Sequence, residues 1–308
     1  MRKLTTCSIT LIAALTLLAC GGAERSPELD GEAVDAAGSL SVYTVNYPLR
    51  YFAERIGGTA VEVVFPAPPG VDPAYWSPDA ATVAAYQSAD LILLNGADYA
   101  KWIARVSLPA SSQVDTSAAI ADRLIPLEDL VTHSHGPEGD HEHGGLAFTT
   151  WLDPSIAAAQ ATAVVDALIE LRPALEPRLR EALAGLDADL SALDRRLQAV
   201  AVKIGDAPLL FSHPVYQYLI RRYGLNGRSV HWEPDEAPNL DELRALLPDH
   251  TARWVIWEGA PAPESVRALE EEGVSSLVFA PCGNVPDEGD YLAVMERNVA
   301  ALESAFPE

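Results

Sequence analysis

The hydrophobic pattern of the chain is dominated by one long stripe of leucines. From about Pro177 to Lys203, apolar residues recur at alternating steps of four and three, which places them on one face of a helix. The stripe consists of Leu179, Leu183, Leu186, Leu190, Leu193, Leu197 and Val200. Such a helix would be ~40 Å long. No second heptad pattern exists for it to pair with, so the stripe predicts an isolated helix that joins two lobes, in preference to a coiled coil.

Strand and helix patterns alternate on both sides of this helix. Before it, strands are predicted at residues 40–45, 61–65 and 89–96, and helices at 47–56, at 79–88 and from Tyr99. After it, strands are predicted at 208–211, 227–232, 254–257 and 276–279, and helices at 216–222, 240–247, 264–272 and 291–306. Continuous apolar strands between helices indicate parallel sheets covered on both faces. The prediction is an α/β fold with two Rossmann-like lobes joined by one long rigid helix, the second lobe repeating the first.

The first 19 residues have the features of an export signal. Arg2 and Lys3 precede an apolar run, Ile9 to Leu18, that is too short to span a membrane. The run ends at Cys20 in Leu-Leu-Ala-Cys, which resembles a bacterial lipobox, in which the cysteine becomes the lipidated first residue of the mature protein. The alternative is an ordinary cleaved signal peptide with a chance cysteine. Residues 20–39 hold little to bury and predict a flexible tether at a membrane surface.

Composition limits the possible partners. The chain has 308 residues and a net charge of −23, and loss of Arg2 and Lys3 with the signal would bring it to about −25, which disfavours nucleic acid. With Cys7 removed and Cys20 lipidated, only Cys282 remains, so no intramolecular disulfide is expected. The predicted boundaries are a signal peptide at 1–19, a tether at 20–39, a first lobe at 40–150, a connecting segment with the long helix at 151–203 and a second lobe at 204–308.

Short motifs follow one another in a recognisable order along nearly the whole mature chain. They are Tyr43–Leu49, Ile56–Gly58, Pro68–Pro73, Ala89–Leu91, Asn95–Ala97, Trp102, Trp151–Pro154, Phe211–Tyr218, Arg222–Leu225 and Gly289–Leu292. This order is similar to that of the zinc/manganese substrate-binding proteins of bacterial ABC transporters. The resemblance implies two α/β lobes, a rigid connecting helix and a metal ion between the lobes.

The resemblance also implies four metal ligands, and three of those positions have changed. They correspond here to Ala74, Thr149, His213 and Ala280. Alanine has no donor and threonine is a poor zinc ligand, so the usual site cannot form as written. His213 alone is retained, as a ligand or polar anchor in the cleft; the alternative is a histidine satisfied by backbone within its lobe.

Other residues are candidates for a rebuilt site. Glu258 closes the buried strand 254–257 and resembles a glutamate that the family carries there, usually not as a direct ligand. His231 also closes a strand and is a weaker candidate, because a lone histidine in that position is usually on the surface. His250 follows Pro248 and Asp249 in a turn and is expected to be solvated.

A His-rich loop at residues 133–143 is a separate candidate metal site. It carries His133, His135, His141 and His143 among acidic residues and glycines. His-x-His pairs chelate zinc or copper as neutral imidazoles, and the stretch resembles the His-rich loop of zinc-specific family members. The alternative is a flexible acidic loop with accidental metal affinity.

These features favour a transport protein over an enzyme. Ser212 and His213 are adjacent, and adjacent residues at one strand end do not face each other as a nucleophile and a base must. The sequence contains neither a His-Glu-x-x-His motif nor a phosphate-binding glycine loop. The expected function is a monomeric, lipid-anchored solute-binding protein on the periplasmic or extracytoplasmic side, which captures Zn²⁺, or Mn²⁺ or another divalent metal, and delivers it to a membrane permease. The alternative is a divergent relative that binds a metal chelate, another ligand or a partner, with metal held only by the His-rich loop.

Overall fold

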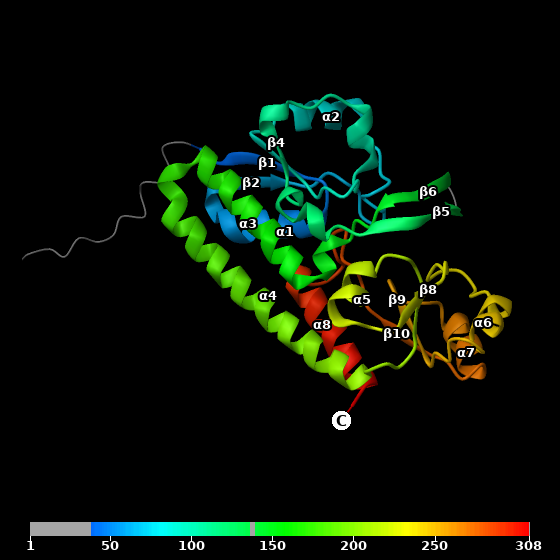
Figure 1. Cartoon of the computed structure of the whole chain (residues 1–308). Coiled ribbons are helices and arrows are strands. Elements are labelled where there is room, and N and C mark those ends of the chain that lie inside the picture. Colours follow the sequence, from blue (N-terminus) through cyan, green and yellow to red (C-terminus); the bar gives the residue numbers. More distant parts are fainter. Residues whose placement is uncertain (1–37, 136–138, 308) are drawn as a thin grey trace, which may run out of the picture. The chain divides into compact units, whose positions relative to one another are not determined.

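The computed structural model describes residues 38–135 and 139–307, and of residues 128–135 and 139–144 it describes only the backbone. The export signal, Cys20 and nearly all of the tether lie outside the described residues. Figure 1 shows two parallel sheets, one formed before and one after the long helix α4 (Glu176–Ile204). This arrangement confirms the predicted α/β fold.

The first sheet contains four parallel strands in the order β2-β1-β3-β4. The strands are β1 (Leu40–Thr44), β2 (Val61–Val64), β3 (Leu91–Leu94) and β4 (Gln113–Asp115). Between them lie α1 (Tyr47–Gly57) and α2 (Ala80–Gln87), capped by Asn46 and Asp79, whose side chains accept the backbone N–H groups of Leu49 and Thr82. The short strand β4 is too brief to produce a hydrophobic pattern, and the sequence did not predict it.

The second sheet has the order β10-β9-β7-β8 and is also entirely parallel. Its elements are β7 (Leu209–Phe211), α5 (Gln217–Tyr223), β8 (Gly227–Ser229), α6 (Leu240–Leu246), β9 (Trp254–Trp257), α7 (Pro263–Glu271), β10 (Ser275–Val278) and α8 (Tyr291–Ala305). Read from its other edge, this sheet has the strand order of the first. The second lobe therefore repeats the first, as the sequence predicted.

The repeated order places equivalent switch points in the two sheets, between β1 and β3 and between β7 and β9. At such a point the carboxyl ends of neighbouring strands diverge and open a crevice. In the first sheet the side chains of Asn46 and Asn95 meet at this point and form a 3.0 Å hydrogen bond. Gln160 donates to the side chains of Asn95 and Thr116, so these buried amides satisfy one another. The first switch point thus holds a network of neutral polar side chains.

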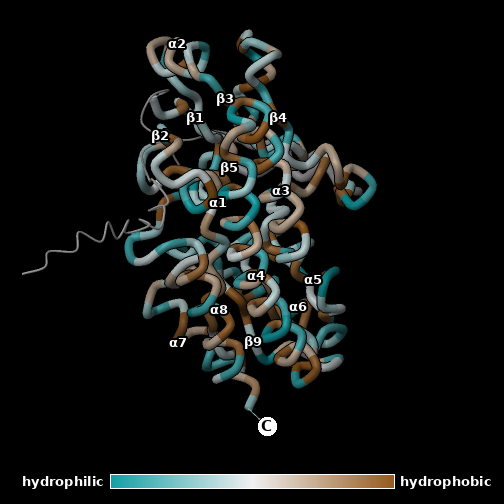
Figure 2. Tube along the Cα trace, turned by 90° about the vertical axis from the view of Figure 1, so that its left-hand side faces the viewer, coloured by the Kyte–Doolittle hydropathy of each residue, from teal (hydrophilic) through white to brown (hydrophobic). Residues whose placement is uncertain are grey.

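The prediction of an isolated long helix was wrong. α4 packs against α1, α3 (Pro154–Leu171) and α8, and Figure 1 shows it running past all three. Because α3 is rich in alanine and apolar over much of its surface, it lacks the narrow stripe that marked α4. Half of α3 is buried in the fold, which explains a mean hydropathy of 1.2 that would also suit a membrane span. Figure 2 shows hydrophobic and hydrophilic residues interleaved along α4, as expected for a helix with one buried face.

The segment predicted to be a His-rich loop has strand backbone on both sides of residues 136–138. β5 (Pro126–His135) and β6 (Gly139–Leu146) form an antiparallel pair in which His133 lies opposite His141. The alternation of histidine with other residues has the period of a strand, which a composition-based prediction of a loop overlooked. The helix predicted from Tyr99 is a 3₁₀ turn instead. The described 3₁₀ turns are Gly58–Ala60, Lys101–Arg105, Ala110–Ser112, Ala118–Arg123, Thr150–Leu152 and Pro173–Leu175.

The leucine stripe of α4 should carry much of the stability of the protein. Leu186 is fully buried, so Leu186→Ala should lower the free energy of unfolding by about 2–5 kcal/mol, through lost burial and the cavity that remains. Val202 on the same helix is 73% exposed, and Val202→Ala should change it by less than about 0.5 kcal/mol. Urea unfolding of both variants measures the difference. Equal losses of unfolding free energy in the two variants would contradict a stabilising role for this stripe.

Candidate metal site

Three potential metal ligands converge at the carboxyl edge of the second sheet. His213, Glu233 and Glu258 each offer one ligand atom, and these atoms lie within 4.8 Å of one another. Nδ1 of His213 is 3.4 Å from Oε1 of Glu233. Among the residues that the structure describes, this is the single cluster of its kind. The structure thus brings together His213 and Glu258, both candidates from the sequence, and adds Glu233.

The strand order explains why these side chains meet. His213 follows β7, Glu233 follows β8 and Glu258 follows β9, and β7 lies between the other two strands. Backbone pairing continues beyond the strand ends through Ser212, which donates to Ile256 and accepts from Trp232. These hydrogen bonds, 2.9 Å and 2.8 Å long, hold the three loops in register. The cluster therefore lies at the switch point of the second sheet. This point is equivalent to the one where Asn46 and Asn95 meet in the first sheet.

The cluster places two carboxyl groups close together in a partly buried position. Burial raises the pKa of Glu258 to about 8, and the charges of Glu233 and Asp72 add to the effect. A carboxyl group with this pKa is mostly protonated at neutral pH. His213 is only 7% exposed, and its ring meets that of His231 edge to face, with 5.5 Å between ring centroids. A divalent cation would satisfy both carboxylates at once, since carboxylates and imidazole are ligands of zinc and manganese.

The cluster adjoins a cavity of about 500 Å³. Residues from both lobes line it: Gly70, Val71, Asp72, Pro73, Tyr99, Phe148, Thr149, Trp151, Val215, Glu258, Gly259, Pro281, Cys282, Gly283 and Asn284. Glu258 belongs both to the cavity wall and to the donor cluster. The cleft is therefore lined by both lobes, although all three donors come from the second.

The three altered ligand positions all have structural contacts in this protein. Ala74 is completely buried in the core. The hydroxyl of Thr149 donates to the backbone oxygen of Val215 and so joins the two lobes. Ala280 is held by Asn298, which accepts from its N–H at 3.0 Å and donates to its carbonyl at 2.8 Å. All three positions therefore take part in packing or hydrogen bonding within the fold.

The remaining candidates have mixed outcomes. His231 contacts His213 but is not one of the three converging donors. The expectation that His250 is solvated was wrong: it is 4% exposed, and its Nε2 lies 2.9 Å from the carbonyl oxygen of Leu209. Cys282 is unpaired and buried, and burial raises the pKa of its thiol to about 12. The side chains of His133, His135, His141 and His143, like Cys20, lie outside what the structure describes.

Glu233 is the member of the cluster that sequence reasoning did not single out as a ligand. The predicted strand ran to Trp232, whereas β8 ends at Ser229, four residues before Glu233. The available signal was its place in His231-Trp232-Glu233, directly after a predicted strand whose neighbours end in His213 and Glu258. Only the strand order of the sheet shows that the loops carrying Glu233, His213 and Glu258 are neighbours.

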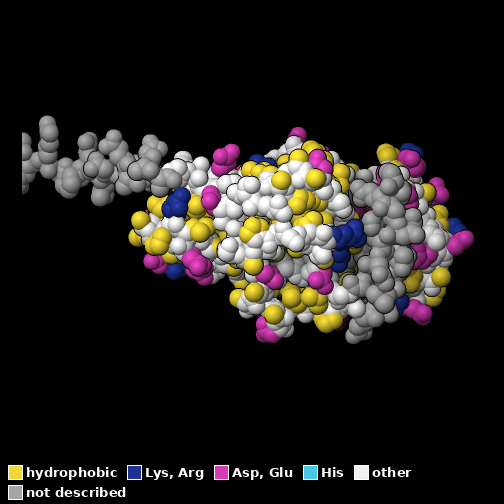
Figure 3. All heavy atoms as spheres, turned by 90° about the horizontal axis from the view of Figure 1, so that it is seen from above, with side chains coloured by type: hydrophobic (Ala, Val, Ile, Leu, Met, Phe, Trp, Pro, Cys, Tyr) yellow, Lys and Arg dark blue, Asp and Glu magenta, His cyan; other side chains and the backbone are white. Residues whose placement is uncertain are grey.

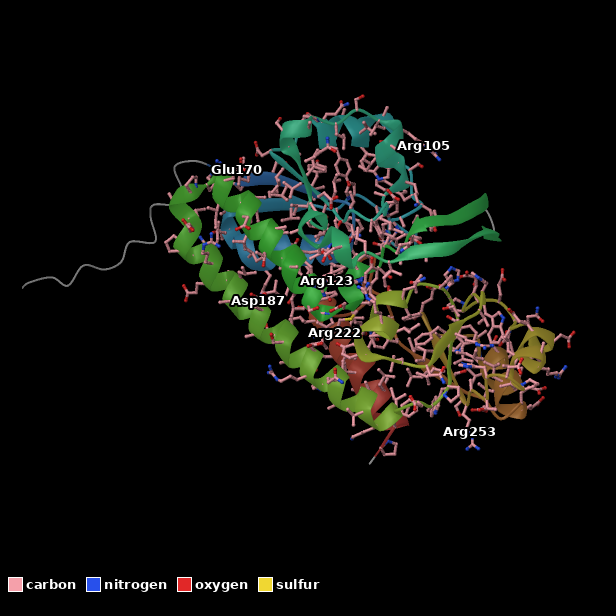
Figure 4. The ribbon with its side chains drawn as sticks, in the orientation of Figure 1. Arg105, Arg123, Glu170, Asp187, Arg222 and Arg253 are labelled. Atoms are coloured by element: carbon pink, nitrogen blue, oxygen red, sulfur yellow. The ribbon has the colours of Figure 1, made fainter. Side chains whose placement is uncertain are left out.

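A charged cluster fixes the segment behind the cleft. Asp153, which is 3% exposed, caps α3 and lies 3.3 Å from Arg123 and 3.7 Å from Arg222. Figure 4 shows both arginines near the start of α3. Arg222 also makes a 2.7 Å ion pair with Asp194 of α4. This cluster ties α5, α3 and α4 together and positions the neighbouring Thr149 and Trp151. Elsewhere the acidic charge is dispersed: Figure 3 shows Asp and Glu scattered over the face seen from above.

The high pKa of Glu258 predicts a pH-dependent stability for the cation-free protein. A folded pKa of about 8, against 4.5 normally, contributes stability that is complete below pH 4.5 and is lost as pH rises towards 8. The slope from this proton should not exceed about 1.4 kcal/mol per pH unit. Glu258→Gln should flatten the curve over this range, whereas the exposed Glu271→Gln should leave it unchanged. Urea unfolding with a chelator at several pH values tests this, and parallel curves would contradict it.

Residues 42–305 match the family described as zinc-uptake complex component A periplasmic. The zinc-binding lipoprotein AdcA of Streptococcus pneumoniae serotype 4 is 25% identical over 307 residues, which cover 95% of this chain and 59% of AdcA. The high-affinity zinc uptake system protein ZnuA of Yersinia pestis is 24% identical over 282 residues, 84% of this chain and 89% of the relative. The manganese-binding lipoprotein MntA of Halalkalibacterium halodurans is 24% identical over 237 residues, 76% and 72% of the two chains.

Solved structures have the same fold. Zn(II)-bound AdcA from Streptococcus pneumoniae aligns with a TM-score of 0.73 and 20% identity, covering 88% of this chain and 58% of AdcA. The ZnuA-like domain of AdcA alone aligns with the same TM-score and identity and is covered completely. The chain spans 59% of the length of AdcA. Because the family match extends over residues 42–305, this chain belongs to the zinc-uptake complex component A periplasmic family.

Proposed function

We propose that this protein is the extracytoplasmic receptor of a divalent-metal importer and that it binds its cargo with His213, Glu233 and Glu258. The observation that carries the proposal is their convergence within 4.8 Å at the edge of the cleft. The family is one of metal-binding transport components, and we propose no catalytic step for this member. The site would replace the one whose ligands are absent at Ala74, Thr149 and Ala280.

Each donor has a defined part in capture. His213 offers a neutral imidazole nitrogen, and the two glutamates offer oxygens and negative charge. Binding requires that Glu258 lose its proton, because a protonated carboxyl group is a poor ligand. Cation uptake would therefore release protons near neutral pH, and the cation would end the repulsion between Glu233 and Glu258.

Zinc is the expected cargo, and manganese is possible. AdcA and ZnuA are named for zinc and MntA for manganese, so relatives of both kinds support this range. Zinc accepts imidazole and carboxylate together, whereas a donor set rich in oxygen also suits manganese. A single imidazole beside two carboxylates is compatible with either ion.

The relatives and the N-terminal sequence support the proposed membrane anchoring and delivery to a permease. Relatives described as lipoproteins support the proposal that Cys20 is lipidated and that residues 20–39 tether the protein to a membrane surface. The receptor would be a monomer outside the cytoplasmic membrane, and it would pass the ion to a permease. The proposed division is a signal at 1–19, a tether at 20–39, a first lobe at 40–150, a connecting segment with the long helix at 151–203 and a second lobe at 204–308.

A second candidate function is binding of a metal chelate. The cleft of about 500 Å³ exceeds what a bare ion occupies, and Tyr99, Phe148 and Trp151 give it an aromatic wall. A small organic ligand that wraps the metal would fill this space, while the His-rich hairpin would hold bare ions separately. Affinity for bare metal distinguishes the two functions.

The first test is a titration of the protein with Zn²⁺ and Mn²⁺ by calorimetry. Wild type should bind one ion tightly in the cleft, and His213→Ala, Glu233→Gln and Glu258→Gln should each weaken this site roughly 100-fold or more, because a removed ligand costs at least as much as a removed outer partner. Glu236→Gln is the matched control for Glu233, since this exposed residue is three positions away.

Deletion of residues 133–143 separates the cleft from the hairpin. The deletion should leave the tight site intact and remove only weaker binding. If the deletion abolishes all binding, or if His213→Ala binds like wild type, the ion is not held in the cleft, and the chelate candidate becomes the stronger one.

Lipid anchoring makes an independent prediction. Cys20→Ser should move the protein from the membrane fraction to the soluble fraction, because its thioether-linked lipids would be lost. Cys7→Ser, within the predicted signal, is the matched control and should leave the protein with the membrane. Fractionation with metabolic lipid labelling measures both. An unlabelled wild-type protein would contradict the anchor.

A further inference from the structure

All three donors belong to the second lobe. His213, Glu233 and Glu258 follow β7, β8 and β9, and the two glutamates come from loops on either side of the loop that carries His213. A cation held by them alone would leave the first lobe without a direct contact. Since zinc prefers four ligands and manganese more, the coordination would remain open towards the cleft.

Asp72 is the acidic residue that the described part of the first lobe contributes to the cleft wall. It lines the same cavity as Glu258 and lies two residues before Ala74, where the expected first-lobe ligand is absent. Its carboxylate is exposed, and Oδ1 accepts the N–H of Ala74 at 2.8 Å, which fixes the turn. Its charge acts on Glu258 across the cleft and on Tyr99 in the cavity wall. Asp72 and Glu258 therefore line one cleft from opposite lobes.

The loop that carries Asp72 is held directly by the second lobe. The side-chain amide of Asn284 donates to the carbonyl oxygens of Pro68 and Val71, each at 2.7 Å. Asn284 is itself part of the cavity lining, and its neighbour Gly283 accepts the N–H of Tyr47 at 2.9 Å. These contacts hold the loop against the second lobe on one side of the cleft, so a rotation of the lobes about these contacts would change the gap between Asp72 and Glu258.

We propose that Asp72 is the ligand that the first lobe supplies, so that the second lobe captures the cation and Asp72 completes its coordination when the cleft closes. This inference rests on the proposed function of the cluster. It gives a final set of one imidazole and three carboxylates. Such a set neutralises a divalent cation more than fully and favours ions that prefer oxygen ligands. Coordination by Asp72 makes closure of the lobes depend on the bound cation.

Asp72→Asn is the central variant, because the amide oxygen can still accept the N–H of Ala74 while the charge is lost. Asp79→Asn is the matched control: Asp79 is an exposed residue of the same lobe that caps α2, and asparagine caps a helix equally well. Both variants lose one charge. Affinities for Zn²⁺ and Mn²⁺, added as simple salts, are measured by competition with a fluorescent chelator, and closure by small-angle scattering with and without the ion.

The expected result is a loss of affinity of about 10- to 100-fold in Asp72→Asn, with a reduced compaction on addition of the ion, and less than a twofold change in Asp79→Asn. Asp72→Ala should behave like Asp72→Asn. Wild-type affinity in Asp72→Asn would overturn the inference, as would a loss confined to Asp72→Ala, because the turn and not the charge would then matter. Failure of the proposed function looks different: wild type then binds no ion, or His213→Ala binds as tightly as wild type.

Discussion

The candidate site depends on two carboxyl groups that the fold holds close together in a partly buried position. Glu233 and Glu258 are held near each other at the end of the second sheet, and burial together with their neighbours raises the pKa of Glu258 to about 8. Two carboxylates in such a place need either a proton or a cation between them. Backbone pairing around Ser212 holds the loops that carry these side chains, so the fold itself keeps the carboxyl groups close together.

The two lobes share one strand order, but different kinds of side chain meet at their switch points. Each has a switch point between the strands that come first and third along the chain and lie side by side in the sheet. Side chains from two loops must meet there. In the first lobe, Asn46 and Asn95 meet and satisfy each other as neutral amides. In the second lobe, His213 and Glu258 meet there, and Glu233 joins them from the neighbouring strand. Neutral amides thus meet at one switch point, whereas an imidazole and two carboxyl groups meet at the other.

The helical frame keeps these two edges in a common cleft. α4 packs on α1 and α3 beside the first sheet and on α8 beside the second, so one buried leucine face serves both lobes. At the cleft, Thr149 hydrogen-bonds Val215 and the indole N–H of Trp151 donates to Pro281 at 2.7 Å. Thr149, where the family resemblance implies a metal ligand, thus takes part in this frame.

The sequence by itself determined the fold to a large extent. The leucine stripe located α4 almost to the residue, and continuous apolar strands indicated parallel sheets in two lobes. These features are local: a periodic apolar pattern follows from the geometry of one element. Helix α3 was missed because an alanine-rich helix that is buried over much of its surface has little amphipathic contrast.

The sequence by itself identified only part of the candidate site. His213 and Glu258 were recognisable because each directly follows a buried strand, and a family resemblance pointed to the histidine. Glu233 and the position of Asp72 across the cleft needed the tertiary structure. The physical reason is that a metal site is a meeting of side chains distant in sequence. Which strand ends are neighbours is decided by hydrogen bonding between strands, and this pairing leaves no periodic signal along any one of them.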